Sequence, residues 1–265
     1  MDKRKSLIDK IKSDLEESGY PLEIEVMKDL LKYKWLVTPQ YHYKDPIEGK
    51  ERSVDFLCLK GGNIQSKDYE RFYVNLIIEC KKLEDKQWVL FTINDAIGRE
   101  NPEAYIQFVA NSRYWMMDFD ISLQIDNLHY YKEIPVALNH YVPFNKKDSL
   151  YEALNQSING LYSKKNQVNK ELNEYDFPDW YGYYMFVPII VVDSNLYQYN
   201  IASDEISEID FLYYRTTGMG EIGDSCIVEI MRKDKLSEYL SKLNVAIDQI
   251  LSFIEAYEPR DPNAV

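Results

Sequence analysis

Three side chains at the ends of two apolar segments are of the types that hydrolytic chemistry needs. Asp55 lies at the start of the segment Val54–Leu59, and Glu79 and Lys81 end a very apolar segment that begins at Phe72. Both segments are predicted strands, and residues two apart on a strand project from the same face, so Glu79 and Lys81 share one side. An ionised carboxylate is rarely left in a buried strand unless a counter-charge or a metal compensates it.

Two carboxylates on neighbouring strands predict an oxygen-ligand site for Mg²⁺. This ion is typically bound by one or two carboxylates and keeps waters through which it meets a substrate phosphate. We therefore expect Asp55 and Glu79 as metal ligands, with Mn²⁺ able to substitute for Mg²⁺. Lys81 would orient the attacking water and steady charge in the transition state. The alternative interpretation is a set of charges placed at strand ends for contact with water.

The periodicity around these residues predicts an α/β fold, in which a central mixed sheet is flanked by helices. The expected helices are Lys3–Glu17, Leu22–Lys34, a segment near Glu103–Asn111, Asp148–Lys165 and Lys233–Ala256. The expected strands include Trp35–Tyr43, Val54–Leu59, Phe72–Cys80, Trp88–Ile93 and Tyr184–Val192. The polar segment Lys164–Asp179 is predicted to be an exposed extension or linker. We expect a single elaborated domain over residues 1–265, with a core at about 20–165 and an elaboration at about 180–256.

Composition and charge exclude some classes of protein. The chain has 265 residues, of which 45% are hydrophobic and 28% charged, and this is an ordinary globular balance. Its net charge of −13 gives no general electrostatic sign of nucleic-acid binding, so such binding needs a local cause. No apolar run is long enough to span a bilayer, and we expect no membrane partner. The three cysteines form no CxxC pair, which favours a reducing, cytoplasmic setting.

The segment from Tyr20 to Trp88 resembles the PD-(D/E)XK, restriction-endonuclease-like nucleases. That family has an α-β-β-β-α-β core, with an acid on the first helix, an Asp on the second strand and a (D/E)-x-K triplet on the third. Glu23 matches the helical acid, Asp55 the strand Asp, and Glu79-Cys80-Lys81 the triplet. The chain departs from the family pattern at the literal "PD", because Val54 precedes Asp55.

The resemblance implies a restriction-endonuclease-like core with a C-terminal β/α elaboration. It also implies a magnesium-dependent endodeoxyribonuclease, a hydrolase of DNA phosphodiester bonds, of the kind found in restriction or phage defence. DNA would be the substrate, and the chain would act as a homodimer or with a partner subunit of a defence complex. Two other functions stay open: a non-catalytic binding or assembly module that keeps the fold, and an RNA-directed nuclease.

Three further residues are weaker candidates for the same site. The helical acid is Glu23 or Glu25, and Glu23 is favoured because it extends the apolar stripe of its helix. Gln156 lies on the predicted helix Asp148–Lys165, where related nucleases often place a polar residue that faces the site; the alternative is a solvated glutamine. Arg52 precedes Asp55 by three residues, as in a pattern common in this group, and could position the substrate.

Overall fold

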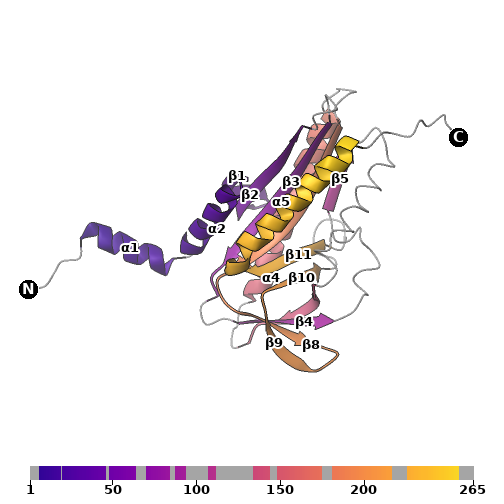
Figure 1. The fold of residues 1–265 in the computed structure, drawn as a ribbon. Helices are drawn as coiled ribbons and strands as arrows, with labels where there is room; N and C mark the ends of the chain where they lie inside the picture. Colours follow the sequence, from indigo (N-terminus) through magenta and orange to yellow (C-terminus); the bar gives the residue numbers. More distant parts are fainter. Residues whose placement is uncertain are drawn as a thin grey trace, which may run out of the picture.

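The computed structural model describes residues 6–18, 20–45, 48–63, 70–83, 87–93, 107–111, 134–143, 148–174, 181–216 and 226–256. Its helices are α1 (Leu7–Glu17), α2 (Tyr20–Lys32), α4 (Ser149–Glu174) and α5 (Lys233–Ala256). Its strands are β1 (Leu36–Lys44), β2 (Glu51–Asn63), β3 (Glu70–Lys81), β4 (Trp88–Ile93), β5 (Gln107–Asn111), β6 (Val136–Tyr141), β7 (Tyr181–Val192), β8 (Leu196–Asn200), β9 (Glu205–Ile209), β10 (Phe211–Thr216) and β11 (Cys226–Arg232). Figure 1 shows their arrangement.

All described strands belong to one mixed sheet, as the sequence predicts. The strand order is β1-β2-β3-β7-β11-β10-β6-β4-β8-β9, and β5 pairs with β7 beside this path. β1, β2 and β3 are antiparallel neighbours, whereas β7 runs parallel to β3 along its whole length and β11 runs parallel to β7. The carboxyl ends of β3, β7 and β11 therefore meet at one edge of the sheet. The segment expected as a C-terminal elaboration supplies β7, which lies directly beside β3.

Helices cover the two faces of this sheet and bury a separate apolar core on each. On one face, α2 and α5 pack over residues such as Phe56, Ile78 and Ile189. On the other face, α4 packs over Ile77 and Ile190. Residues 77 and 78 are adjacent in β3, so strict alternation along a fully buried strand accounts for its nearly continuous apolar sequence. This arrangement places Glu79 and Lys81 on the face that α4 covers.

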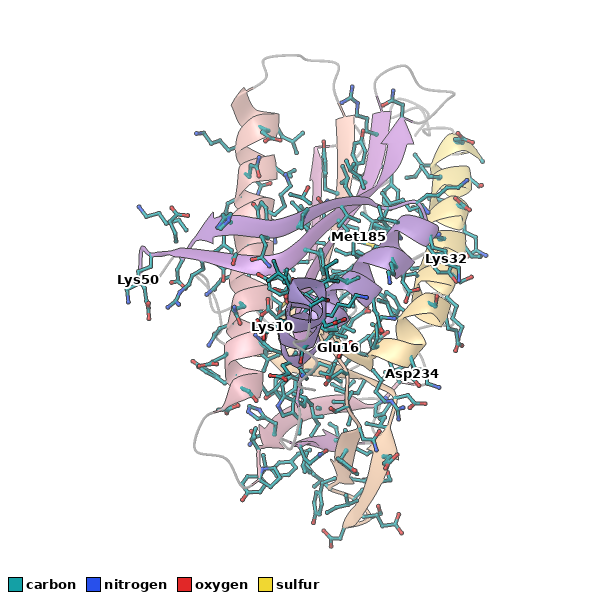
Figure 2. The ribbon with its side chains drawn as sticks, turned by 90° about the vertical axis from the view of Figure 1, so that its left-hand side faces the viewer. Lys10, Glu16, Lys32, Lys50, Met185 and Asp234 are labelled. Carbon is teal, nitrogen blue, oxygen red and sulfur yellow. The ribbon has the colours of Figure 1, made fainter. Side chains whose placement is uncertain are left out.

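The β1–β2 hairpin extends outward from the body, with Lys50 near its end (Figure 2). Its register is regular except at Gln40, which lies between the paired residues Pro39 and Tyr41 and so stands opposite Asp55. Gln40 has φ of +49°, in the left-handed region that non-glycine residues rarely adopt. The irregularity occurs at the point where β2 carries its acidic side chain.

Two sequence predictions differ from the structure. The segment predicted as a helix near Glu103–Asn111 contains strand β5, which pairs antiparallel with β7; residues 103–106 lie outside the described part. This part of β7 is not paired with β11, which pairs only with its last four residues, so β5 satisfies backbone groups that would otherwise be buried without partners. The segment Lys164–Asp179, predicted as an exposed extension or linker, extends α4 as far as Glu174 but is not exposed throughout, because it buries Val168; residues 175–179 lie outside the described part.

Of the helices that the structure describes, none is long and apolar enough to cross a membrane.

Candidate active site

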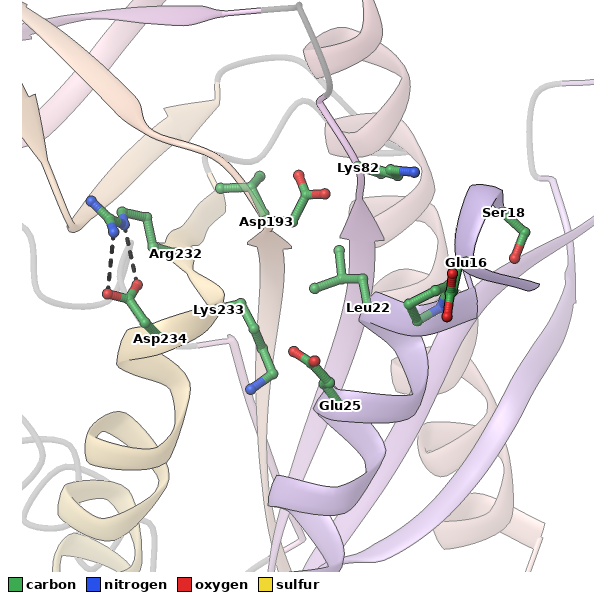
Figure 3. Close-up of a pocket in the computed structure, with 11 residues that line it drawn as sticks. Glu16, Ser18, Leu22, Glu25, Lys82, Asp193, Arg232, Lys233 and Asp234 are labelled. Atoms are coloured by element: carbon green, nitrogen blue, oxygen red, sulfur yellow. Dashed lines mark hydrogen bonds and ion pairs between the residues drawn. The ribbon is translucent and has the colours of Figure 1, made fainter. Parts of the chain in front are cut away.

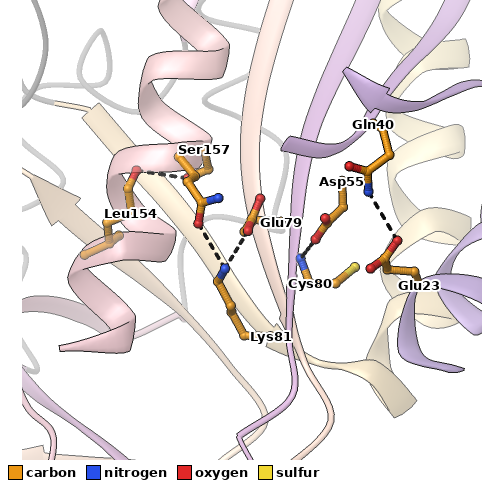
Figure 4. A network of polar contacts seen from close by, with 9 residues as sticks. Glu23, Gln40, Asp55, Glu79, Cys80, Lys81, Leu154 and Ser157 are labelled. Atoms are coloured by element: carbon orange, nitrogen blue, oxygen red, sulfur yellow. Dashed lines mark hydrogen bonds and ion pairs between the residues drawn. The ribbon is translucent and has the colours of Figure 1, made fainter. Parts of the chain in front are cut away.

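The carboxylate of Asp55 and the end of β3 are joined by a main-chain hydrogen bond. Oδ2 of Asp55 accepts a hydrogen bond of 2.7 Å from the backbone N–H of Cys80 (Figure 4). Cys80 stands between Glu79 and Lys81, so this bond fixes the acid of β2 against the two charged residues of β3. Bonding to a backbone donor also favours the ionised carboxylate, although burial has the larger, opposite effect and raises the pKa of Asp55.

Glu79 is the most deeply buried acid of this group, with 2% of the residue exposed. Its Oε1 atom accepts a hydrogen bond from Nζ of Lys81 at 2.6 Å. Its Oε2 atom is buried and has no hydrogen-bond partner among the described residues. Burial, and then the negative charge of Asp55, raise the pKa of Glu79 to about 7, and Lys81 and the backbone N–H of Asp55 only partly oppose this. An acceptor oxygen buried without a donor carries a substantial desolvation cost, which a bound cation would remove.

Lys81 connects β3 to helix α4. Besides its bond to Glu79, its Nζ atom donates to Oε1 of Gln156 at 2.9 Å. Gln156 thus belongs to the site and is not simply a solvated glutamine. About a quarter of the Lys81 side chain remains exposed, so solvent reaches it. Two of its three N–H donors are engaged by these described neighbours, and the geometry leaves a third for a water or a phosphate oxygen.

Glu23 approaches the same group from α2, and Glu25 does not. Oε2 of Glu23 lies 3.5 Å from the side-chain Nε2 of Gln40, and burial followed by the charge of Asp55 raises the pKa of Glu23. Glu25 is exposed. The difference follows from the packing of α2, which buries Leu22, Val26 and Leu30 and thereby turns its first-turn acid toward β1 and β2.

Arg52 is not brought to the carboxylates by any described contact. Its guanidinium donates to Oε2 of Glu48 at 2.9 Å in the outer part of the β1–β2 hairpin. Lys50 pairs with the same glutamate at 3.0 Å. These pairs are largely exposed, and such pairs contribute little to stability.

The structure adds Gln40 to the residues that sequence reasoning found, and it places Tyr43 of β1 within electrostatic reach of Glu79. Gln40 hydrogen-bonds with Glu23 and also lowers the pKa of Asp55, so one amide group serves acids from two elements. Tyr43 is buried, and the charge of Glu79 adds to burial in raising its pKa, so it stays a neutral hydroxyl. A single glutamine on a strand carries no recognisable pattern, and the positive φ that aims Gln40 is not encoded by a glycine or an asparagine.

The described residues hold no ready-made cluster of three or more His, Cys, Asp and Glu side chains suited to a metal ion. Asp55 and Glu79 nevertheless fit Mg²⁺, which needs only one or two carboxylates and completes its shell with water and substrate oxygens. A positive ion bound here would give the Oε2 atom of Glu79 a partner and would lower the raised pKa values of Glu79 and Asp55.

A separate pocket of about 430 Å³ lies outside this group (Figure 3). It is lined by residues of α1 and α2 and by residues that follow β3, β7 and β11, among them Lys82, Asp193 and Lys233. Both acidic and basic side chains line it, and Arg232 is already paired with Asp234 at 3.1 Å. The mixture selects no ligand charge, so we assign no role to this pocket.

Comparisons with known proteins add no identification. No protein-family model, no curated protein and no solved structure matches the chain.

Proposed function

We propose that the chain is a metal-dependent nuclease that hydrolyses phosphodiester bonds in DNA. The observation that carries the proposal has two parts: Asp55, bonded to the backbone N–H of Cys80, lies within electrostatic reach of the Glu79–Lys81 pair, and one oxygen of Glu79 is buried without a hydrogen-bond donor among the described residues. A purely structural ion pair would be expected to satisfy both carboxylate oxygens, because half-satisfied buried charges are costly. The site resembles a ligand site more than a stabilising network.

The order of elements supports a restriction-endonuclease-like core. Helix α2, antiparallel strands β1, β2 and β3, helix α4 and strand β7 follow one another as that resemblance implies, with β4, β5 and β6 intervening before α4. The acid of the second strand and the triplet of the third lie side by side in this arrangement. The expected place of such a chain in restriction or phage defence rests on the resemblance alone.

Each residue has a defined task in the proposed reaction. Asp55 and Glu79 would hold Mg²⁺, which supplies Lewis-acid charge to the phosphate and the leaving oxygen. Lys81 would hold the attacking water in line with phosphorus and stabilise the charge that develops on the phosphoryl oxygens. Gln156 would fix the ammonium group of Lys81. Glu23 would act as a further metal ligand, or as an acid that contacts the ligands and not the metal.

The test compares Lys81→Met with Lys82→Met on plasmid DNA and on RNA, with Mg²⁺ or with EDTA. Lys82 is the next residue along the chain. Its Nζ atom lies 3.5 Å from the backbone oxygen of Glu17, away from Glu79. We expect the wild type to cut DNA only with Mg²⁺, and Lys81→Met to lose at least about 100-fold in rate, as when a charge-stabilising donor is removed. Lys82→Met should keep its rate.

Three results would each reject the proposal in a different way. Cleavage that persists in EDTA and in Lys81→Met would exclude this site. Binding of DNA without cleavage under any metal condition would favour a non-catalytic module. Cleavage of RNA in preference to DNA would keep the chemistry and change the substrate.

A further inference from the structure

Helix α1 carries an apolar stripe that no described part of the chain covers. Its 11 residues bury no side chain, and Leu7, Ile8, Ile11 and Leu15 are 73%, 64%, 57% and 39% exposed. The helix projects from the rest of the molecule (Figure 1), and it faces the viewer in Figure 2. Large aliphatic side chains gathered on one face of a helix favour burial against another surface.

The sequence of α1 nevertheless specifies a helix. Ser6 forms a capping box with Asp9: the Ser6 hydroxyl accepts from the Asp9 N–H at 3.1 Å, and the Asp9 carboxylate accepts from the Ser6 N–H at 3.1 Å. An isolated helix of this length is marginal in water even with good caps, since most helical stability in proteins comes from packing. A helix with a defined start, a consistent apolar stripe and no packing of that stripe against the described residues has a free surface for a partner.

We propose that the partner is α1 of a second copy of this chain, packed antiparallel about a two-fold axis beside Ile11. Such an interface is self-complementary, because the same surface is used twice. Ile8 precedes Ile11 by three residues and Leu15 follows it by four. Reversing one helix therefore brings Ile8 nearly level with Leu15 of the second copy, while the two Ile11 side chains meet at the axis.

The charges beside the stripe agree with this pairing. Lys10 and Asp14 lie on the same flank of α1, four residues apart, and both are exposed. When two antiparallel helices are related by such an axis, the side of one helix that carries Lys10 and Asp14 lies next to the same side of the other helix. The two helices run in opposite directions. Lys10 then lies beside Asp14 of the other chain, and symmetry forms this pair twice. The opposite ends of the helix also attract, because Glu16 and Glu17 follow the stripe and Lys3, Arg4 and Lys5 precede it in the sequence.

The size of the stripe sets the expected strength of the pairing. A standard stable interface buries about 800 Å² on each partner, and an 11-residue helix offers less than that. We therefore expect a weak dimer that forms with rising protein concentration. It does not depend on the proposed nuclease activity, because α1 contributes no residue to the group around Asp55.

Sedimentation velocity over a concentration series, on the full chain with EDTA present, tests the pairing. The wild type should shift from monomer to dimer mass. Ile11→Asp should raise the dissociation constant at least tenfold, roughly, because two charges would meet at the axis. Ile206→Asp is the matched control: Ile206 is 64% exposed on β9, and its replacement should leave the mass distribution unchanged. A wild type that stays monomeric, or an Ile11→Asp variant that dimerises normally, would overturn the proposal.

A mixing experiment tests the antiparallel geometry. Lys10→Glu places two like charges against Asp14 of the second copy, and Asp14→Lys places two like charges against Lys10. Each variant alone should dimerise less than the wild type. An equimolar mixture should regain dimer, because the introduced glutamate of one chain then meets the introduced lysine of the other. Within each helix nothing changes on mixing, so recovery reports contacts between copies. Failure to recover would reject this pairing even if the chain is an active nuclease, and recovery would stand even if it is not.

Discussion

The carboxylate of Asp55 accepts a hydrogen bond of 2.7 Å from the backbone N–H of Cys80, and this bond joins β2 to β3 at the centre of the candidate site. Cys80 lies between the two charged residues of the triplet, so the bond holds Asp55 against the end of β3 without using a side chain of that strand. A main-chain donor is fixed by the sheet itself. The position of Asp55 is therefore determined by the strand register.

Glu79 should make the stability of the metal-free protein depend on pH. Its pKa is raised from 4.5 to about 7 in the folded chain, so between these values the folded state holds a proton that the unfolded state has lost. Stability must then fall as pH rises through this window. Glu79→Gln mimics the protonated acid, so the variant should lack this fall in stability with pH, which is at most about 3 kcal/mol in the wild type. Unfolding by urea in EDTA at pH 5, 6 and 7.5 measures it.

Comparing the two proteins removes the other titrating groups. Burial also raises the pKa of Glu229, to about 8, but that group is present in both chains and its effect cancels in the difference. Adding Mg²⁺ at pH 7.5 should stabilise the wild type and leave Glu79→Gln nearly unchanged, since the metal needs the ionised carboxylate. If the free energies of unfolding of the wild type and Glu79→Gln changed with pH in the same way, Glu79 would not have the raised pKa that its burial implies.

Gln156 should affect the rate of the proposed reaction through Lys81 alone. Gln156→Leu removes the acceptor that lies 2.9 Å from Nζ of Lys81, which frees the ammonium group to rotate. We expect the turnover rate to fall about tenfold with little change in the stabilisation by Mg²⁺, because no metal ligand is altered. Glu152→Gln, on the exposed side of the same helix, is the control and should keep its rate. Equal losses in rate and in metal stabilisation would show that Gln156 acts on the metal ligands instead.

Much of the fold follows from residue patterns that are local. The alternation along β3 places residues 77 and 79 on one face and 78 on the other, and the structure keeps this division between its two cores. The common side of Glu79 and Lys81 follows from the same rule. The strand at Gln107–Asn111 could not be found in this way, because it forms where β7 needs a partner and not where the local pattern favours a strand.

The candidate site was less accessible to such reasoning where it depends on contacts between distant elements. Gln156 meets Lys81 only because α4 docks on β3, 75 positions earlier in the chain. Gln40 reaches Glu23 only because its backbone adopts a φ of +49°. Arg52 has the spacing typical of a site residue, yet a glutamate four residues before it pairs with its guanidinium.

The backbone conformation that places the Gln40 amide between Glu23 and Asp55 should destabilise the folded protein. A left-handed backbone costs a non-glycine residue roughly 1 kcal/mol or more. Gln40→Gly removes the amide and this strain, whereas Gln40→Ala removes only the amide. We expect Gln40→Gly to be the more stable of the two by about 1 kcal/mol, although glycine normally weakens a strand. Both variants should lose Mg²⁺ stabilisation in thermal unfolding, because Asp55 and Glu23 lose a shared donor. A more stable alanine variant would mean that the φ of Gln40 is not strained.

Gly160 should be required for α4 to pack against the sheet. A Cβ atom at this position would lie 2.9 Å from Cγ1 of Val54 and 3.2 Å from Cγ2 of Ile77, both on buried, β-branched side chains with little freedom to move. Gly160→Ala gains about 1 kcal/mol in helix propensity but loses about 1–3 kcal/mol through overpacking, so we expect net destabilisation.

To make room for the added methyl group, α4 must shift away from the sheet. Gln156 lies one turn before Gly160 on this helix and would move away from Lys81 with it, so Gly160→Ala should also lower the rate of the proposed reaction. Gly62→Ala is the matched control, because a Cβ atom there meets no atom within 4 Å and its φ is not positive. Urea unfolding of the two variants compares the effects directly. If Gly160→Ala were more stable than the wild type, the close approach of α4 to Val54 would be wrong, and the contact between Gln156 and Lys81 that depends on it would lose its support.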